Sequence, residues 1–223
     1  MTFFERLEVE TNAERQQLMS VGIIQDALRG HISLPQYVAF LNQAYHHVRH
    51  TVPLLMACGS KLPRTLDWLR AAIAEYIEEE LGHDEWILSD IAACGADPDA
   101  VRVSQPHFTT ELMVAYAYHQ IDRHDPVGFF GMVHVLEGTS TAIATNAATS
   151  IQSVLELPQS AFTYLTSHGS LDIAHVETFK GLVNRIGREH EPAVVHCSRA
   201  IYRLYADIFR ALPAYGSAIK EHG

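Results

Sequence analysis

Two pairs of a carboxylate and a histidine, each three residues apart, are the residues in this sequence best suited to chemistry. Glu80 and His83 form the first pair, Asp172 and His175 form the second, and His168 lies four residues before Asp172. Residues three or four apart share one face of a helix, so each segment could direct a carboxylate and an imidazole at one centre. One such pair arises often by chance, but two pairs in separate segments indicate a metal site.

The first pair has two open details. Glu79 is four residues from His83, so it could replace Glu80 on the same helix face. Gly82 lies beside His83 in what the pattern predicts to be the middle of a helix, where Gly costs about 1 kcal/mol relative to Ala. That cost suggests that space beside His83 is needed. The alternative for this acidic segment is a solvated helix face that carries one histidine by chance.

A single carboxylate in an apolar stretch supplies a third contribution. Glu137 is the only formally charged residue between Pro126 and Leu155, and a helix with so few charges is mostly buried. A lone buried carboxylate is costly unless it is paired or bound to a metal. The alternative is a Glu137 that is hydrogen-bonded to a Tyr or Arg, or protonated. With the two pairs, Glu137 approaches the pattern of di-iron carboxylate bundles.

The donor types favour iron or manganese over other metals. Calcium and magnesium prefer oxygen ligands, and structural zinc usually recruits cysteine. Cys58, Cys94 and Cys197 are far apart and form no C-x-x-C pair. Two metals that share about six protein ligands would leave open positions for O2 and a substrate.

Further histidines could complete or support such a site. His46, His47 and His50 lie in a segment without acids, and we expect either His47 or His50 to face the bundle as a ligand. The others would lie at the surface or donate a ring N–H to a ligating carboxylate. His134, one turn before Glu137, could support that carboxylate in the same way.

The elements that must position these residues are helices. Apolar residues recur at spacings of three and four almost throughout, which predicts an all-α bundle. A helix through Pro35 should kink at Pro53 and end before Gly59, and residues 95–108 should form a loop. The expected helices cover roughly residues 3–29, 33–58, 65–94, 109–123, 125–153, 158–167, 170–187 and 190–212.

Composition narrows the function classes. The 223 residues are 48% hydrophobic and 19% charged, which excludes a disordered chain, and the net charge of -10 opposes nucleic acid and anionic membrane surfaces as partners. The first residues lack a signal-peptide core, and no apolar run approaches the roughly 20 residues of a membrane span. We therefore expect a soluble cytoplasmic protein with a small-molecule substrate. Its apolar helix faces would also allow a homodimer.

The ordered set Glu80-x-x-His83, Glu137 and His168-x3-Asp172-x2-His175 resembles the heme-oxygenase-like diiron oxidases and oxygenases, in the superfamily that includes TenA and PQQ-biosynthesis protein C. The resemblance covers about residues 15–210. It implies one domain over residues 1–223 with a bundle of seven to eight helices. It also implies that these six residues bind two Fe2+ per chain, that O2 is a co-substrate, and that an amino-acid or fatty-acid-like substrate is oxidised or fragmented. Glu137 is the candidate bridging carboxylate.

Three alternative functions can be weighed against the sequence. A TenA-type hydrolase needs a nucleophilic cysteine in mid-chain, and none lies between Cys94 and Cys197. A heme oxygenase needs an axial histidine near its N-terminus, where His31 lies in an ordinary polar turn. A non-catalytic helical binding protein would use the same carboxylates and histidines as a buried polar network. Neither enzyme alternative explains Glu137 together with Asp172 and His175.

Overall fold

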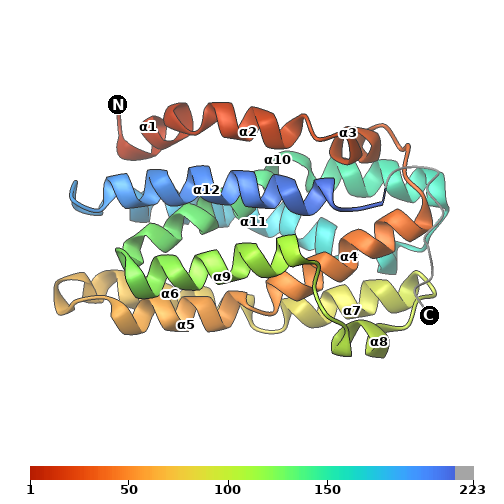
Figure 1. Cartoon of the computed structure of the whole chain (residues 1–223), viewed down its shortest axis with the longest axis horizontal. Helices are drawn as coiled ribbons and strands as arrows, with labels where there is room; N and C mark the ends of the chain where they lie inside the picture. Colours follow the sequence, from red (N-terminus) through yellow and green to blue (C-terminus); the bar gives the residue numbers. More distant parts are fainter. Residues whose placement is uncertain (214–223) are drawn as a thin grey trace.

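The computed structural model describes residues 1–213, except for the side chains of residues 168–174. In this range the chain forms α-helices and three 3₁₀ segments without any β-strand, which confirms the predicted all-α class. Most helices follow the long axis of an elongated bundle (Figure 1). The α-helices are α1 (Phe3–Glu10), α2 (Asn12–Met19), α3 (Gly22–Leu28), α4 (Leu34–Val48), α5 (Thr51–Lys61), α6 (Asp67–Glu80), α7 (His83–Ala93), α8 (Pro98–Val103), α9 (Phe108–Arg123), α10 (Phe130–Leu155), α11 (Thr163–Val183) and α12 (Glu191–Arg210). The 3₁₀ segments are η1 (Arg64–Leu66), η2 (Pro126–Phe129) and η3 (Gln159–Ala161).

Several predicted helices are divided where the sequence pattern is continuous. The helix expected over 33–58 breaks at Arg49 and His50, and α5 then runs through Gly59 to Lys61. Pro53 lies in the first turn of α5, where its missing N–H is tolerated, so the expected kink and early end are wrong. The segment 3–29, expected to form one or two helices, forms three, α1, α2 and α3, and the helix expected over 65–94 is divided into α6 and α7.

Two other predicted boundaries are also wrong. Residues 98–103, expected in a loop, form α8, whose first backbone N–H groups donate to the side chain of Asp97. The two helices expected over 158–167 and 170–187 are instead η3 and one continuous α11. A single glycine within a helix costs only about 1 kcal/mol, which the packing of a long helix can offset.

Helix α10 packs against α11, α12 and α3. Its approach to α12 is close at Gly131, where a Cβ atom would lie 2.6 Å from Val194 O and from Ser198 N. Glycine is therefore required at this crossing. Contrary to expectation, the segment Pro126–Leu155 has the length and mean hydropathy (1.2) of a candidate membrane span, and 56% of its most apolar window is buried. The core helix of a soluble protein has these same properties, so they are weak evidence for a membrane.

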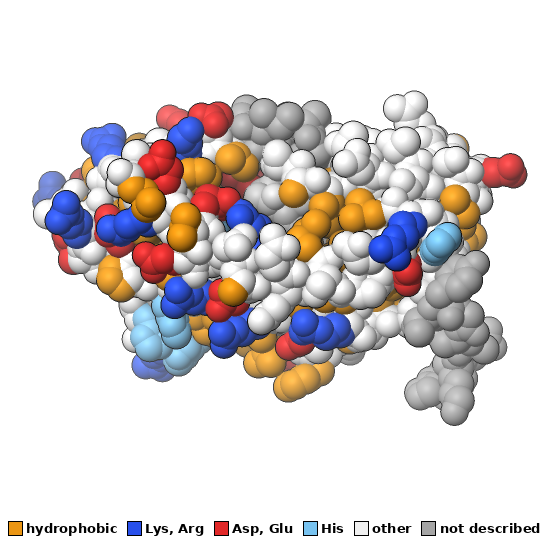
Figure 2. Space-filling model, turned by 90° about the horizontal axis from the view of Figure 1, so that it is seen from above, with side chains coloured by type: hydrophobic (Ala, Val, Ile, Leu, Met, Phe, Trp, Pro, Cys, Tyr) orange, Lys and Arg blue, Asp and Glu red, His pale blue; other side chains and the backbone are white. Residues whose placement is uncertain are grey.

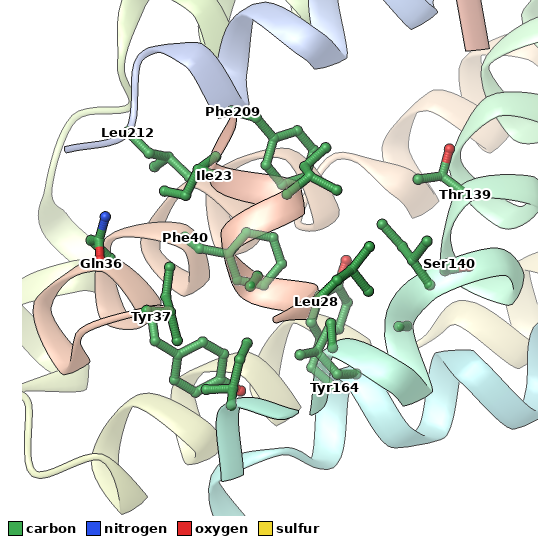
Figure 3. A pocket seen from close by; sticks show the side chains of 18 of the residues that line it. Ile23, Leu28, Gln36, Tyr37, Phe40, Thr139, Ser140, Tyr164, Phe209 and Leu212 are labelled. Carbon is green, nitrogen blue, oxygen red and sulfur yellow. The ribbon is translucent and has the colours of Figure 1, made fainter. Parts of the chain in front are cut away.

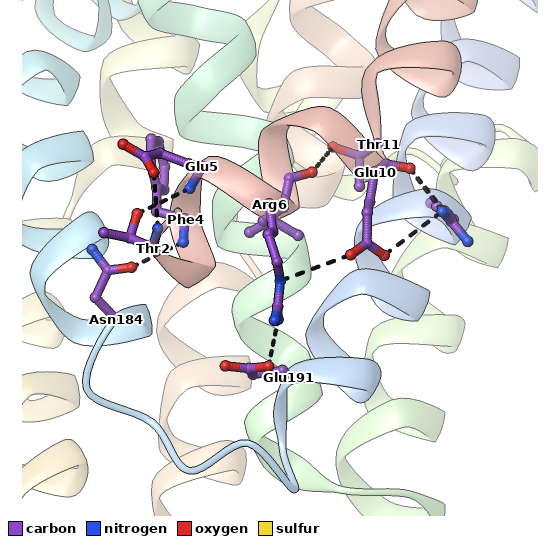
Figure 4. Close-up of polar contacts among 10 residues, drawn as sticks. Thr2, Phe4, Glu5, Arg6, Glu10, Thr11, Asn184 and Glu191 are labelled. Carbon is purple, nitrogen blue, oxygen red and sulfur yellow. Dashed lines mark hydrogen bonds and ion pairs between the residues drawn. The ribbon is translucent and has the colours of Figure 1, made fainter.

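Helix α1 lies against α11 and α12 through polar contacts at its exposed edge (Figure 4). The backbone N–H of Phe4 donates to Asn184 Oδ1 at 2.9 Å, and Arg6 forms an ion pair with Glu191. Thr2 caps the N-terminus of the helix, where its hydroxyl accepts from Glu5 N and its backbone N–H donates to Glu5. The face above α1, α2 and α3 carries charges of both signs, interspersed over one half and sparse over the other (Figure 2).

Candidate functional site

Glu80 and His83 face each other across a break between two helices. Helix α6 ends at Glu80 and α7 begins at His83, with Gly82 between them at φ +85°. His83 Nδ1 lies 3.1 Å from Glu80 Oε2, and both side chains are buried. A Cβ atom on Gly82 would meet no atom within 4 Å, so the glycine provides a left-handed backbone rather than the space beside His83 that the sequence suggested. Trp86 stacks on the His83 ring at 4.0 Å between centroids.

His175 brings the second segment to the same region. Its Nε2 lies 3.1 Å from Glu79 Oε2, and its Nδ1 lies 4.0 Å from Glu137 Oε1. The Tyr76 hydroxyl donates to the His175 backbone carbonyl at 3.4 Å. The His175 and Glu137 side chains are only 10% and 12% exposed, whereas Glu79 is 55% exposed. Both candidates from α6 are therefore engaged: Glu80 with His83, and Glu79 with His175.

The donor set fits iron in kind but does not form a compact cluster among the described residues. Buried carboxylates and imidazoles from α6, α7, α10 and α11 are suitable ligands for iron. No group of three or more His, Cys, Asp or Glu residues in the described part of the chain is placed to hold a metal ion. The side chains of His168 and Asp172, predicted as ligands, lie outside the described residues. Their helix, α11, is the one that carries His175.

A cavity of about 90 Å³, here called the site cavity, lies beside these residues. Glu80 and Glu137 contribute carboxylates to its wall, and His47 contributes an imidazole. The other described lining residues are Val48, Thr51, Leu54, Leu55, Tyr76, Phe129, Met132, Val133, Leu136, Ser140, Tyr164 and Tyr205. Two carboxylates and an imidazole in a largely apolar wall are an arrangement suited to a metal or a polar ligand.

The three histidines of the α4–α5 region divide between two sides of the bundle. His47 faces the site cavity and stacks on Tyr205 at 5.8 Å. His46 bonds through Nε2 to Ser104 Oγ at 2.9 Å, and His50 lies 3.5 Å from the Tyr118 hydroxyl. Burial lowers the pKa of both His46 and His50 below 6.5. His47 is therefore the histidine of this group that could complete a metal site. It is one of the two residues, His47 and His50, that the sequence analysis expected to face the bundle.

His134 contacts residues other than Glu137 with both ring nitrogens. Nε2 lies 2.7 Å from Glu8 Oε1, and Nδ1 lies 3.2 Å from Ser198 Oγ. This bond to His134 lowers the pKa of Glu8 to about 2, and Arg15 adds to the effect. His134 and Glu137 both line a further cavity open toward α1 and α2. The expected role of His134 as a direct support for Glu137 is replaced by a link to the N-terminal helix.

Asp90 positions the helix that carries His175, a role that the sequence analysis did not predict. Its carboxylate, fully buried on α7, accepts the backbone N–H groups of Thr163 and Tyr164 at 3.0 and 2.8 Å. These are the first residues of α11, so Asp90 caps that helix from a distant part of the chain. Burial raises the pKa of Asp90, and the N–H donors oppose that rise. Its sequence position, 73 residues before Thr163, hid this role.

The cysteines and His31 are poorly placed for the alternative chemistries. All three thiols are buried, and burial raises the pKa of Cys58 to about 12, of Cys94 to about 11 and of Cys197 to about 12. Because the thiolate is the nucleophile, such thiols are inert at neutral pH. His31 is exposed in the turn between α3 and α4.

A profile of the family described as "Iron-containing redox enzyme" matches residues 38–206, so the chain belongs to that family. No curated protein matches the chain. Among solved structures, a domain of unknown function with a heme oxygenase-like fold from Shewanella denitrificans OS217 is similar, with a TM-score of 0.82 and 23% identity over 94% of this chain and 91% of that one.

Two further structures share the fold at lower identity. A TenA homologue from P. horikoshii OT3 has a TM-score of 0.79 and 8% identity, and covers 94% of this chain and 97% of its own. Heme oxygenase-1 from the cyanobacterium Synechocystis sp. PCC6803, solved in complex with heme, has a TM-score of 0.73 and 10% identity over 94% and 91%. The fold is therefore heme oxygenase-like, as predicted.

Proposed function

We propose that this member of the iron-containing redox enzyme family is a non-heme diiron oxidase or oxygenase. The observation that carries the proposal is a set of two largely buried pairs, Glu80 with His83 and Glu137 with His175, whose two carboxylates lie in the wall of one cavity. The described residues offer two buried carboxylates and two buried imidazoles, which a soluble protein retains at a cost unless they are paired or bind a metal.

The ligands that we propose for two Fe2+ ions are Glu80, His83, Glu137, His168, Asp172 and His175, with His47 as a further candidate from α4. Bound iron would supply activation of O2 for oxidation or fragmentation of a small amino-acid or fatty-acid-like substrate. In the sequence, Glu137 lies between the ligands proposed from α6–α7 and those from α11, and it would suit a carboxylate shared by two ions. Glu79 would hold His175 through Nε2, and Tyr76 would hold its backbone.

The apolar wall of the site cavity would exclude bulk water from the reacting groups. Leu54, Leu55 and Phe129 are buried there, and they strengthen the field of nearby carboxylates by keeping the local dielectric low. We further propose a cytoplasmic protein that binds neither nucleic acid nor membrane, and a homodimer as its assembly.

The rival proposals are a metal-free TenA-type hydrolase and a non-catalytic binding protein. A cysteine hydrolase requires a reactive thiol in the cavity, whereas all three thiols are buried with raised pKa values and none of them lines the site cavity. A binding protein would need no redox-active metal.

Oxygen uptake by the iron-loaded protein tests the proposal. With Fe(II) bound and a reductant present, the wild-type protein should consume O2 well above free Fe(II), Glu137→Gln should lose this excess, and Cys197→Ala should keep it. Uptake that follows free iron alone, or that survives Glu137→Gln, would contradict an oxidase. Loss of turnover in Cys197→Ala with no effect of iron would favour the hydrolase.

A further inference from the structure

A second cavity, here called the apolar cavity, lies next to the site cavity and is lined by α3, α4, α10 and α12 (Figure 3). It also has a volume of about 90 Å³, and its described lining contains no charged side chain. Figure 3 shows the side chains of Ile23, Leu28, Phe40 and Phe209 around the same space. These residues come from α3, α4 and α12, while Ile143 and Ala147 close it from α10.

The polar groups at the far end of the apolar cavity are engaged elsewhere. The Tyr37 hydroxyl donates to Ala161 O at 2.7 Å, and Gln36 Nε2 donates to Pro213 O at 2.8 Å. They therefore present mainly carbon surface to the cavity. An occupant of this space would gain free energy from burial of apolar area rather than from hydrogen bonds.

The two cavities meet at three side chains. Ser140, Tyr164 and Tyr205 line both of them, and Ser140 lies one turn after Glu137 on α10. Of these two cavities, only the site cavity has the carboxylates of Glu80 and Glu137 in its wall. The two neighbouring cavities therefore offer carboxylates on one side and apolar side chains on the other, an arrangement that suits an amphipathic ligand.

The volumes limit the length of that ligand. An apolar protein cavity of 150 Å³ holds one benzene molecule, so a cavity of about 90 Å³ has room for roughly four carbon atoms. The site cavity, of equal volume, has similar room for a head group and the carbons next to it. A ring in the apolar cavity, or a chain much longer than six carbons, would need the walls to move.

We propose that the substrate is a small aliphatic molecule of roughly eight non-hydrogen atoms, with its polar group beside Glu80 and Glu137 and a chain of about four carbons in the apolar cavity. This proposal depends on the proposed function in one respect only, namely which end of the substrate reacts. The chain would pass Ser140, Tyr164 and Tyr205, and its length would decide which molecules bind.

Straight-chain 1-alkanols from propanol to decanol test this without any turnover. Binding to the full-length protein is measured by ligand-observed NMR, with and without Fe(II). Each added methylene should tighten binding about fourfold, up to about six carbons, and longer chains should gain nothing. In the iron-free protein hexylamine should bind more tightly than hexanol, and Glu137→Gln should reduce that difference. Equal gains through decanol, or no dependence on length, would overturn the proposal.

Matched variants test whether the alkyl chain of the ligand lies in the apolar cavity. Ala147→Phe fills the apolar cavity and should abolish the gain per methylene, whereas Thr145→Phe adds the same ring at an exposed position of the same helix and should change nothing. Ile143→Ala enlarges the cavity and should move the limit to longer chains, which keeps the test decisive if Ala147→Phe fails to fold. An unchanged limit in Ile143→Ala would overturn the proposal. If the alkanol series fails while iron binds normally, the ligand proposal is wrong and the proposed oxidase function is unaffected. If the series succeeds while iron does not bind, the oxidase function is wrong and the ligand site is unaffected.

Discussion

His83 Nδ1 lies 3.1 Å from Glu80 Oε2 although a break between α6 and α7 separates the two residues. The pair is thus assembled by a turn in the chain and not by one helix face. Gly82, at φ +85°, makes that turn and starts α7 in the direction that buries His83. The site geometry on this side depends on one backbone conformation that L-residues rarely adopt.

Gly82→Ala should therefore weaken the fold and the site together. A left-handed conformation costs a non-glycine residue about 1–2 kcal/mol, and the free energy of unfolding should fall by about that amount in urea titrations. No atom lies near the new Cβ, so the loss would come from backbone strain alone. Fe(II) affinity should decrease as well, because relief of the strain moves Glu80 relative to His83.

Gly181→Ala is the matched control. Gly181 lies within α11 with open space around its Cβ position and without a positive φ. Alanine should stabilise the helix there by about 0.5–1 kcal/mol. If Gly82→Ala and Gly181→Ala changed the free energy of unfolding equally, a side chain at residue 82 would not strain the turn, and the prediction would be wrong.

The residue types of the site could be predicted from the sequence, but their arrangement could not. The scarcity of charge around Glu137 correctly predicted a largely buried carboxylate on a buried helix. The spacing of Glu80 and His83 correctly predicted that they meet, for a reason that was wrong, because spacing alone does not distinguish a continuous helix from a tight turn. Gly82 was the available signal of a positive φ.

Contacts between distant segments explain the other differences. Glu8 to His134 and Asp90 to Thr163 join residues far apart in the chain, and no local pattern marks them. For the same reason, the sequence did not show which of the histidines near the end of α4 faces the site. His47 and His50 are three residues apart, and the break at Arg49 and His50 turns one toward the cavity and the other toward Tyr118.

Asp90→Ala should destabilise the protein by about 2 kcal/mol, because it removes the acceptor for two backbone N–H groups at the start of α11. Asp97→Ala removes a cap of the short, exposed α8 and should cost about 1 kcal/mol or less. Urea unfolding followed by circular dichroism would measure both losses. A smaller loss for Asp90→Ala than for Asp97→Ala would contradict the capping role.

The contribution of Glu8 should depend on pH in a defined window. His134 and Arg15 lower the pKa of Glu8 from 4.5 to about 2, so the folded protein holds this carboxylate ionised where the unfolded chain would protonate it. The stabilisation is complete above pH 4.5 and is lost as the pH falls toward 2. Wild type should exceed Glu8→Gln in stability at pH 6, and the difference should shrink below pH 4.5.

Glu10→Gln is the control for that series, since Glu10 is on the same helix but forms a solvent-exposed ion pair with Arg6. Exposed ion pairs contribute little to stability, so this substitution should have little effect at any pH. A difference between wild type and Glu8→Gln that stays constant from pH 6 to pH 3 would contradict the role of the hydrogen bond between Glu8 and His134.

The cysteines should resist alkylation in the native protein. Burial keeps the pKa values of Cys58, Cys94 and Cys197 at about 11–12, so almost no thiolate is present at pH 8. Mass spectrometry after iodoacetamide should find no modified cysteine in the folded protein and three in urea. Rapid modification of one native thiol would identify a reactive cysteine and would revive the hydrolase alternative.

Anaerobic titration with Fe(II), counting bound ions per chain, tests the central claim most directly. We predict two ions per wild-type chain and a loss of at least one in Glu137→Gln, with circular dichroism unchanged. Glu177→Gln, at an exposed position of α11, should retain both ions. Absence of saturable binding in the wild type, or two ions in Glu137→Gln, would contradict a diiron site built around Glu137.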